Sequence, residues 1–194
     1  MSTPALIRRS LVDFFRELVR AAMRTHEVAS SEPTEHYLVS LLERFAKPPP
    51  GWHSRPLALD YLESLQSTRA HRCVKLQHVG DTALFLCGVF MEHLERQTVS
   101  TGYYVSLGRI AYHQLAGLAP NEPAARADVF AEIAARFPDF VRVLSEISFA
   151  EIFPGDAQTV RIYTRWLRTR GPQDAQWLLR QGITPFDPGL KTRH

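Results

Sequence analysis

Apolar side chains recur at intervals of three or four residues along most of the chain, and proline or glycine separates one such stretch from the next. This spacing places apolar side chains on one face of an α-helix, whereas a strand requires strict alternation. The pattern predicts nine or ten helices and no strand of adequate length. We therefore expect an all-α fold, a compact single-domain bundle that spans residues 1–194.

Helix boundaries are indicated at several points by capping residues and by proline. The first amphipathic helix is expected to end near Arg24, and Ser31 is a suitable N-cap for the second. A further helix is expected to open at Pro56. The proline-rich segment 48–51 is the one place where a minor domain boundary is expected, and residues 183–194 read as a C-terminal tail.

The most apolar stretch of the chain indicates its central helix. Gly80 fits the position just beyond a helix C-terminus, and Asp81 fits the N-cap of the next helix, which we expect at residues 82–96. The first turns of that helix read TALFLCGVFM and are apolar on all sides. A helix of this kind is typical of the middle of a fold, so the bundle is expected to form around it.

Two glycines, Gly88 and Gly108, fall inside predicted helices, where each costs about 1 kcal/mol relative to alanine. Either close packing against a neighbouring element or room for a ligand would offset that cost, and close packing is the commoner reason. If the reason is a ligand, aromatic and histidine side chains on the same two helices would line its pocket. The candidate pocket residues are Gly88, His93, Tyr103, Tyr104, Gly108 and His113.

The two segments that carry these glycines, VGDTALFLCGVFMEHL at 79–94 and TGYYVSLGRIAYHQLA at 101–116, resemble a pattern found in uncharacterised bacterial helical proteins. The pattern consists of Gly-Asp, a small apolar helix, a pair of tyrosines and a second helix that contains glycine. The resemblance implies a bacterial protein in which these segments form a core helical hairpin. It implies no activity, cofactor or catalytic residue. The residues that carry it are Asp81, Gly88, Tyr103, Tyr104, Gly108 and Tyr112.

Composition and charge narrow the class of protein. With 45% apolar and 22% charged residues the chain has the make-up of a globular protein, and two cysteines cannot build a disulfide framework or a zinc cluster of four cysteines. The longest apolar run is far shorter than the roughly 20 residues of a membrane span, and no targeting segment is recognisable, so we expect a cytoplasmic location. The net charge of +3 is unevenly distributed, because residues 155–194 carry seven basic and three acidic side chains.

Candidate chemistry is sparse. His71, His78 and Asp81 would form a three-ligand metal set only if one helix continued past Gly80, which we do not expect, so no metal or cofactor is predicted. Cys87 lies in an apolar run, where burial raises the pKa of a thiol and makes it unreactive. We find no catalytic residue.

A row of arginines near the C-terminus is the most distinctive charged pattern. The row follows an i, i+4, i+7 spacing on one helix face with an aromatic residue between its members, and it comprises Arg161, Arg165, Trp166 and Arg168. Arginine forks suit phosphates and carboxylates, and a tryptophan can anchor in a partner's pocket. A solvated face of an amphipathic helix explains the same pattern, and we favour that interpretation over nucleic-acid binding.

Three functional hypotheses follow. The leading one is a non-enzymatic scaffold or regulatory adaptor that binds another protein, with a homodimer as a further partner that the sequence permits. The alternative is a small-molecule or cofactor-binding protein with its pocket at the helix pair of Gly88 and Gly108. The third is nucleic-acid binding through the face of Arg161, Arg165 and Arg168, which the sequence disfavours without excluding it.

Overall fold

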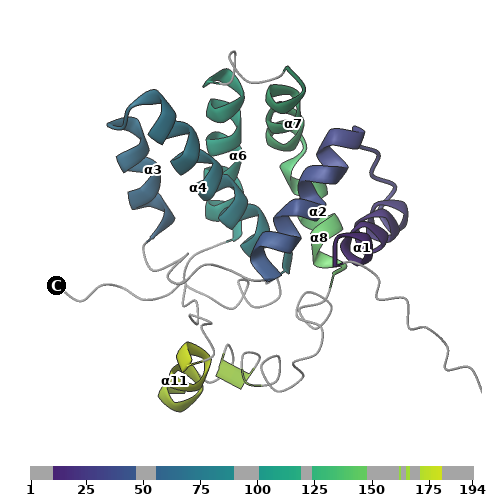
Figure 1. Ribbon diagram of the computed structural model, residues 1–194, viewed down its shortest axis with the longest axis vertical. Coiled ribbons are helices and arrows are strands. Elements are labelled where there is room, and N and C mark those ends of the chain that lie inside the picture. Colours follow the sequence, from purple (N-terminus) through teal and green to yellow (C-terminus); the bar gives the residue numbers. More distant parts are fainter. Residues whose placement is uncertain are drawn as a thin grey trace, which may run out of the picture.

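The computed structural model describes residues 11–46, 56–89, 101–118, 124–147, 162, 165–166 and 171–180. These residues form eight helices and no strand, which confirms the all-α prediction for the described part of the chain (Figure 1). Nine or ten helices were expected over the whole chain. The helices are α1 (Leu11–Thr25), α2 (Glu32–Ala46), α3 (Leu57–Leu65), α4 (Arg69–Val89), α6 (Thr101–Leu118), α7 (Ala124–Ala135), α8 (Phe137–Ser145) and α11 (Pro172–Arg180).

Helix α4 lies at the centre of the bundle and packs against α2, α3, α6 and α8. Figure 1 shows α4 running diagonally between α3 and the pair of α2 and α8, with α6 and α7 alongside each other. All residues from Val79 to Gly88 are buried, as expected for a stretch that is apolar on nearly every side. None of the described helices is both long and apolar enough to cross a membrane.

The expected start of the central helix is wrong. Helix α4 begins at Arg69 and runs without interruption through Gly80 and Asp81 to Val89, so the break predicted before residue 82 is absent; residues 90–96 lie outside the described part. Gly80 serves packing instead of ending a helix. A Cβ there would lie 3.0 Å from three ring carbons of Tyr112, so glycine makes room for that ring.

The connection between α1 and α2 is fixed by a left-handed residue. The amide of Val28 donates to the carbonyl of Met23 at 2.9 Å and that of Glu27 to the carbonyl of Arg24 at 3.2 Å, a Schellman arrangement. Glu27 adopts a positive φ of 52° at the position that favours glycine. Val28 and Met23 are both buried, which supplies the apolar contact that accompanies this motif.

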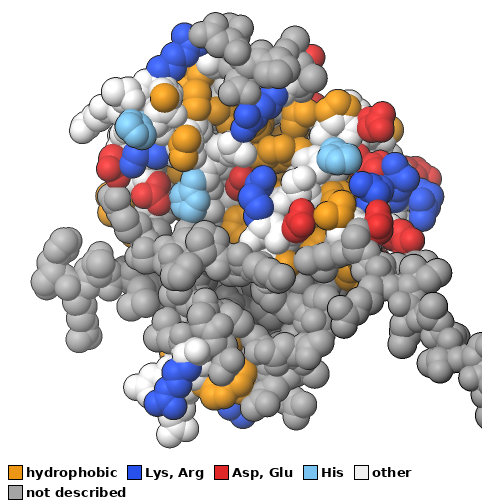
Figure 2. Space-filling model, in the orientation of Figure 1, with side chains coloured by type: hydrophobic (Ala, Val, Ile, Leu, Met, Phe, Trp, Pro, Cys, Tyr) orange, Lys and Arg blue, Asp and Glu red, His pale blue; other side chains and the backbone are white. Residues whose placement is uncertain are grey.

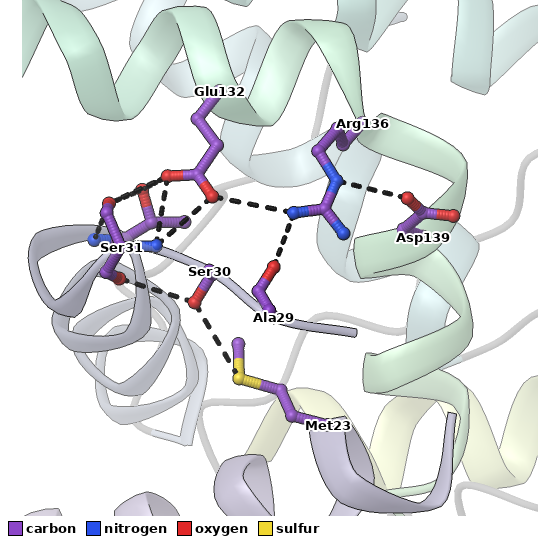
Figure 3. Close-up of polar contacts among 8 residues, drawn as sticks. Met23, Ala29, Ser30, Ser31, Glu132, Arg136 and Asp139 are labelled. Carbon is purple, nitrogen blue, oxygen red and sulfur yellow. Dashed lines mark hydrogen bonds and ion pairs between the residues drawn. The ribbon is translucent and has the colours of Figure 1, made fainter. Parts of the chain in front are cut away.

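The predicted N-cap of α2 is confirmed. The amide of Thr34 donates to Oγ of Ser31 at 3.3 Å, and the Ser31 and Thr34 hydroxyls each donate to the carboxylate of Glu132 in α7 at 2.7 Å. Arg136 donates to the carbonyl of Ala29 and through Nε to Asp139 at 3.2 Å. Figure 3 shows these contacts, through which α7 and α8 hold the segment that enters α2.

The two interior glycines are explained by close packing. A Cβ on Gly88 would lie 2.4 Å from Cβ of Leu144 in α8, and a Cβ on Gly108 would lie 2.5 Å from Cζ of Phe137 and 2.9 Å from Cβ of Ala83. Leu144 and Phe137 are completely buried. Side chains of α8 therefore fill the space beside both glycines, which allows α4 and α6 to approach α8 closely.

We expect Gly88→Ala to lower the free energy of unfolding by about 1–2 kcal/mol, because the overpacking cost against Leu144 exceeds the gain in helix propensity. Gly117→Ala is the matched control, since nothing lies within 4 Å of a Cβ there. That control should be neutral or raise the free energy of unfolding by up to about 1 kcal/mol. Urea denaturation of both variants measures the difference, and a Gly88→Ala variant as stable as Gly117→Ala would contradict the packing.

Candidate functional site

A buried carboxylate in α4 forms a polar cluster that joins three helices. Asp81 is only 6% exposed. Its Oδ1 accepts hydrogen bonds from the hydroxyls of Tyr112 in α6, at 2.6 Å, and of Tyr37 in α2. Its Oδ2 accepts from Nη2 of Arg44 at 2.8 Å. We call these four residues the Asp81 cluster, and it ties α2, α4 and α6 to one another.

Burial dominates the electrostatics of the cluster. It raises the pKa of Asp81, while the Arg44 guanidinium and the two tyrosine hydroxyls act against that rise. Burial, followed by the neighbouring charge of Asp81, also raises the pKa of both Tyr37 and Tyr112. Both tyrosines therefore keep their protons at neutral pH and remain hydrogen-bond donors. Because the donors to both carboxylate oxygens come from other helices, the cluster joins α2 and α6 to α4.

A hollow lies between α6 and α7. It has a volume of about 480 Å³, and its lining residues are Ser106, Arg109, Ile110, His113, Gln114, Ala131, Ala134 and Ala135. The α6 members follow the spacing i, i+3, i+4, i+7 and i+8, so they share one face of that helix. Nε of Arg109 donates to the carbonyl of Ala134 at 3.3 Å across the hollow.

Large apolar side chains are exposed on the neighbouring helices. Among the described residues, five of the six exposed large apolar side chains lie on α3 and α6, and we call them the α3–α6 face: Leu59, Leu62, Leu65, Tyr103 and Ile110. The two helices are in contact, because Nε2 of Gln114 donates to the Tyr61 hydroxyl at 2.6 Å. Helical spacing puts Gln114 on the same side of α6 as Tyr103 and Ile110. Its contact with Tyr61 therefore places α3 beside that exposed side.

Three arginines around this face bind neutral oxygens only. Arg69 donates to the carbonyl of Leu118 at 2.8 Å, Arg72 to Oε1 of Gln114 at 2.8 Å, and Arg109 to the carbonyl of Ala134. Within the described ranges no carboxylate lies within ion-pair distance of these three side chains. None of the three therefore forms an ion pair with a described acidic residue.

The predicted pocket residues are found in different surroundings. Gly88 and Gly108 contact side chains of α8, Tyr104 is buried, and Tyr103 is 39% exposed. Of the described candidates, His113 alone lines the hollow between α6 and α7. His93 lies outside the described residues. The pocket was predicted at the helix pair of Gly88 and Gly108, where side chains of α8 lie, whereas neither glycine lines the hollow between α6 and α7.

The predicted arginine face is only partly described. Arg161 and Arg168 lie outside the described residues. Arg165 forms a two-pronged ion pair with Asp174 of α11, with N–O distances of 2.9 and 2.5 Å, and this pairing lowers the pKa of Asp174. Trp166 is only 5% exposed, so its ring is packed inside the protein. Among the described side chains on the side shown in Figure 2, acidic and basic groups are interspersed, with no stripe of a single sign.

The candidate metal ligands His71, His78 and Asp81 each have other partners. His71 hydrogen-bonds the Thr68 hydroxyl at 3.0 Å, His78 lies 3.9 Å from Asp60, and Asp81 is enclosed in its cluster. Helix α4 does continue past Gly80, yet in the described part of the chain no three His, Cys, Asp or Glu side chains are placed to hold a metal. Cys87 is buried as expected, and burial raises its pKa to about 12.

The chain was compared with family models, with curated proteins and with solved structures, and none of the three comparisons found a match. The resemblance placed Asp81 and Tyr112 in one structural unit, but sequence reasoning missed their hydrogen bond, the other members of the Asp81 cluster and the hollow. A carboxylate inside an otherwise apolar stretch was a usable signal for the cluster. The alanines at 131, 134 and 135, which share one side of α7, were a signal for the hollow.

We expect Tyr112→Phe to lower the free energy of unfolding by about 2 kcal/mol, because it removes a donor from a buried charged acceptor. Tyr103→Phe removes a more exposed hydroxyl of the same helix, which bonds the backbone of Ala58, and it is the control; it should lower the free energy of unfolding by about 1 kcal/mol or less. Chemical denaturation followed by circular dichroism compares the two. If the two substitutions lower the free energy of unfolding equally, the hydrogen bond to Asp81 adds no more stability than an exposed one.

We expect the free energy of unfolding to fall between about pH 9 and pH 12. The unfolded thiol of Cys87 loses its proton near its ordinary pKa of 9.0, whereas the folded thiol keeps it up to about 12. The unfolded state therefore binds fewer protons across this window, which favours unfolding by about 1.4 kcal/mol for each pH unit. Urea denaturation at several alkaline pH values measures the slope, and Cys87→Ala should reduce it; a flat profile in the native protein would contradict the burial.

Proposed function

We propose that this protein is a scaffold or adaptor that binds an acidic amphipathic helix of another protein through the α3–α6 face. The observation that carries the proposal is the concentration of exposed large apolar side chains on α3 and α6. Exposed apolar side chains that gather on neighbouring helices commonly mark an interaction site. A binding role needs no catalytic group. In this role the Asp81 cluster holds α6 in place behind the binding surface.

The outer side of α3 is apolar without serving the interior. Leu57 and Ser64 are buried on the inner side of this helix, whereas Leu59, Leu62 and Leu65 follow one another at intervals of three and are about half exposed. Covering each leucine with a partner would contribute roughly 1 kcal/mol. A helix laid along α3 and α6 would contact these leucines and Ile110 with a single apolar stripe, as in other helix-in-groove complexes.

The charge around the face favours an acidic partner. Arg69, Arg72 and Arg109 bind carbonyl or amide oxygens and meet no carboxylate among the described residues. Carboxylates on the flanks of a bound helix would pair with these guanidinium groups while its apolar stripe covers the leucines. Charge pairs of this kind mainly set specificity and association rate, so binding should weaken as salt is raised.

We expect Leu62→Asp to weaken binding of the partner at least about tenfold, because it places a charge in the middle of the apolar stripe. The partner is captured from an extract of the source cells, identified, purified, and titrated calorimetrically against the wild type and its variants. Val74→Asp is the matched control: Val74 is 68% exposed but lies on α4, outside the α3–α6 face. It should leave the affinity unchanged.

Two results would overturn the proposal. If Leu62→Asp and Val74→Asp bind the purified partner equally well, the α3–α6 face is not the contact surface. Sedimentation velocity tests the other occupant: if the wild type self-associates and Leu62→Asp is monomeric, the face binds a second copy of this chain instead. Circular dichroism of each variant verifies that its helices are intact, so that a loss of binding reports on the surface.

A further inference from the structure

We propose that the hollow between α6 and α7 binds a small organic anion, with Arg109 holding its oxyanion and the alanines of α7 packing against its apolar body. This inference goes beyond the proposed protein binding, because it concerns a small ligand, and the two proposals share only Arg109 and Ile110. It depends on the shape and chemistry of the hollow and would stand if the α3–α6 face proved to have no partner.

The hollow has the dimensions of a metabolite site. Its volume of about 480 Å³ falls within the range of roughly 300–1,000 Å³ that is typical of small-molecule pockets. Ala131, Ala134 and Ala135 follow the spacing i, i+3, i+4 and share one side of α7. Because these side chains end at Cβ, they leave space that a leucine in the same positions would occupy, and Ile110 forms an apolar wall opposite them.

The polar groups of the hollow are donors or neutral groups, and none is a carboxylate. The guanidinium of Arg109 is anchored through Nε to the carbonyl of Ala134, so its remaining N–H donors stay available at a fixed place. Ser106 and His113 lie one turn on either side of Arg109 and add a hydroxyl and an imidazole. Gln114 accepts from Arg72 through Oε1 and donates to the Tyr61 hydroxyl through Nε2, so we assign it no ligand contact beyond lining the hollow.

The charge of Arg109 determines the class of ligand. A guanidinium with no carboxylate near it in the described part of the chain attracts an anion, and its fork matches the geometry of both carboxylate and phosphate. The apolar remainder of the lining requires that the anion carry a hydrocarbon or aromatic body. A carboxylate and a phosphate monoester share this chemistry, and the experiment distinguishes them.

The test uses three probes with one apolar body and different head groups: 4-phenylbutanoate, 4-phenylbutyl phosphate and 4-phenylbutan-1-ol. Each is titrated into the full chain labelled with ¹⁵N, and amide shifts are followed by NMR. At least one anion should bind at millimolar concentration with shifts centred on residues 106–114 and 131–135, and the alcohol should bind about tenfold more weakly or worse. The stronger anion identifies the preferred head group.

Two substitutions separate the role of the charge from that of the space. Arg109→Gln should weaken anion binding about tenfold or more, whereas Arg24→Gln, an exposed arginine of α1, should leave it unchanged. Ala131→Leu should abolish binding of all three probes by filling the hollow, and the exposed position of Ala131 keeps the fold intact.

The proposal is overturned if no probe binds, if the alcohol binds as well as the anions, or if Arg109→Gln has no effect beyond that of Arg24→Gln. Leu62→Asp separates this inference from the proposed protein binding. That variant should bind the probes like the wild type while it loses the protein partner. Normal probe binding with no partner effect would leave the hollow supported and the adaptor proposal refuted.

Discussion

The Asp81 carboxylate is the constraint on which the arrangement of the helices depends. A carboxylate buried in the middle of a helix is tolerated only if donors surround it, because an unpartnered buried charge costs several kcal/mol. Here the donors come from α2 and α6, so those helices are held in one register against α4. The ring of Tyr112 fits against Gly80 and packs on Phe130 and Phe137 at centroid distances of 5.9 and 6.2 Å, which brings α7 and α8 to the same centre.

This centre also explains how α6 supports the proposed functions. Tyr112 and Gly108 face inward, toward Asp81 and Phe137, and fix the rotation of α6 about its axis. With that rotation fixed, Tyr103, Ile110 and Arg109 must face outward. The interior thus determines which side chains of α6 face solvent, where the proposed partner and ligand would bind.

The helices and most of the buried positions could be predicted from the sequence, because they depend on local spacing. The N-cap at Ser31, the burial of Cys87 and the continuously buried stretch after Val79 were all predictable on these grounds. The interpretation failed at Gly80 and Asp81, where glycine followed by a capping residue is the ordinary sign of a helix boundary. Asp81 instead accepts hydrogen bonds from Tyr37 and Tyr112, which lie 44 and 31 positions away in the chain. No local pattern reveals such distant partners.

The outer features could not be predicted for a related reason. Periodicity identifies the apolar positions of a helix but not which of them another element covers, so Leu57 and Leu62 looked alike although the first is 4% and the second 55% exposed. The hollow requires two helices at a particular separation, with alanines of α7 opposite Ile110 and Arg109. Separation of this kind is set by packing at the centre of the fold.

Native-state hydrogen exchange of the wild-type protein tests the central claim most directly. If α4 is held from all sides through the Asp81 cluster, the amides of residues 76–87 should exchange only by global unfolding and be the slowest in the protein. The amides of α3, which packs mainly on α4, should exchange through smaller openings. Exchange of the α4 amides by local opening, at a lower free energy than those of α1 or α3, would contradict the account.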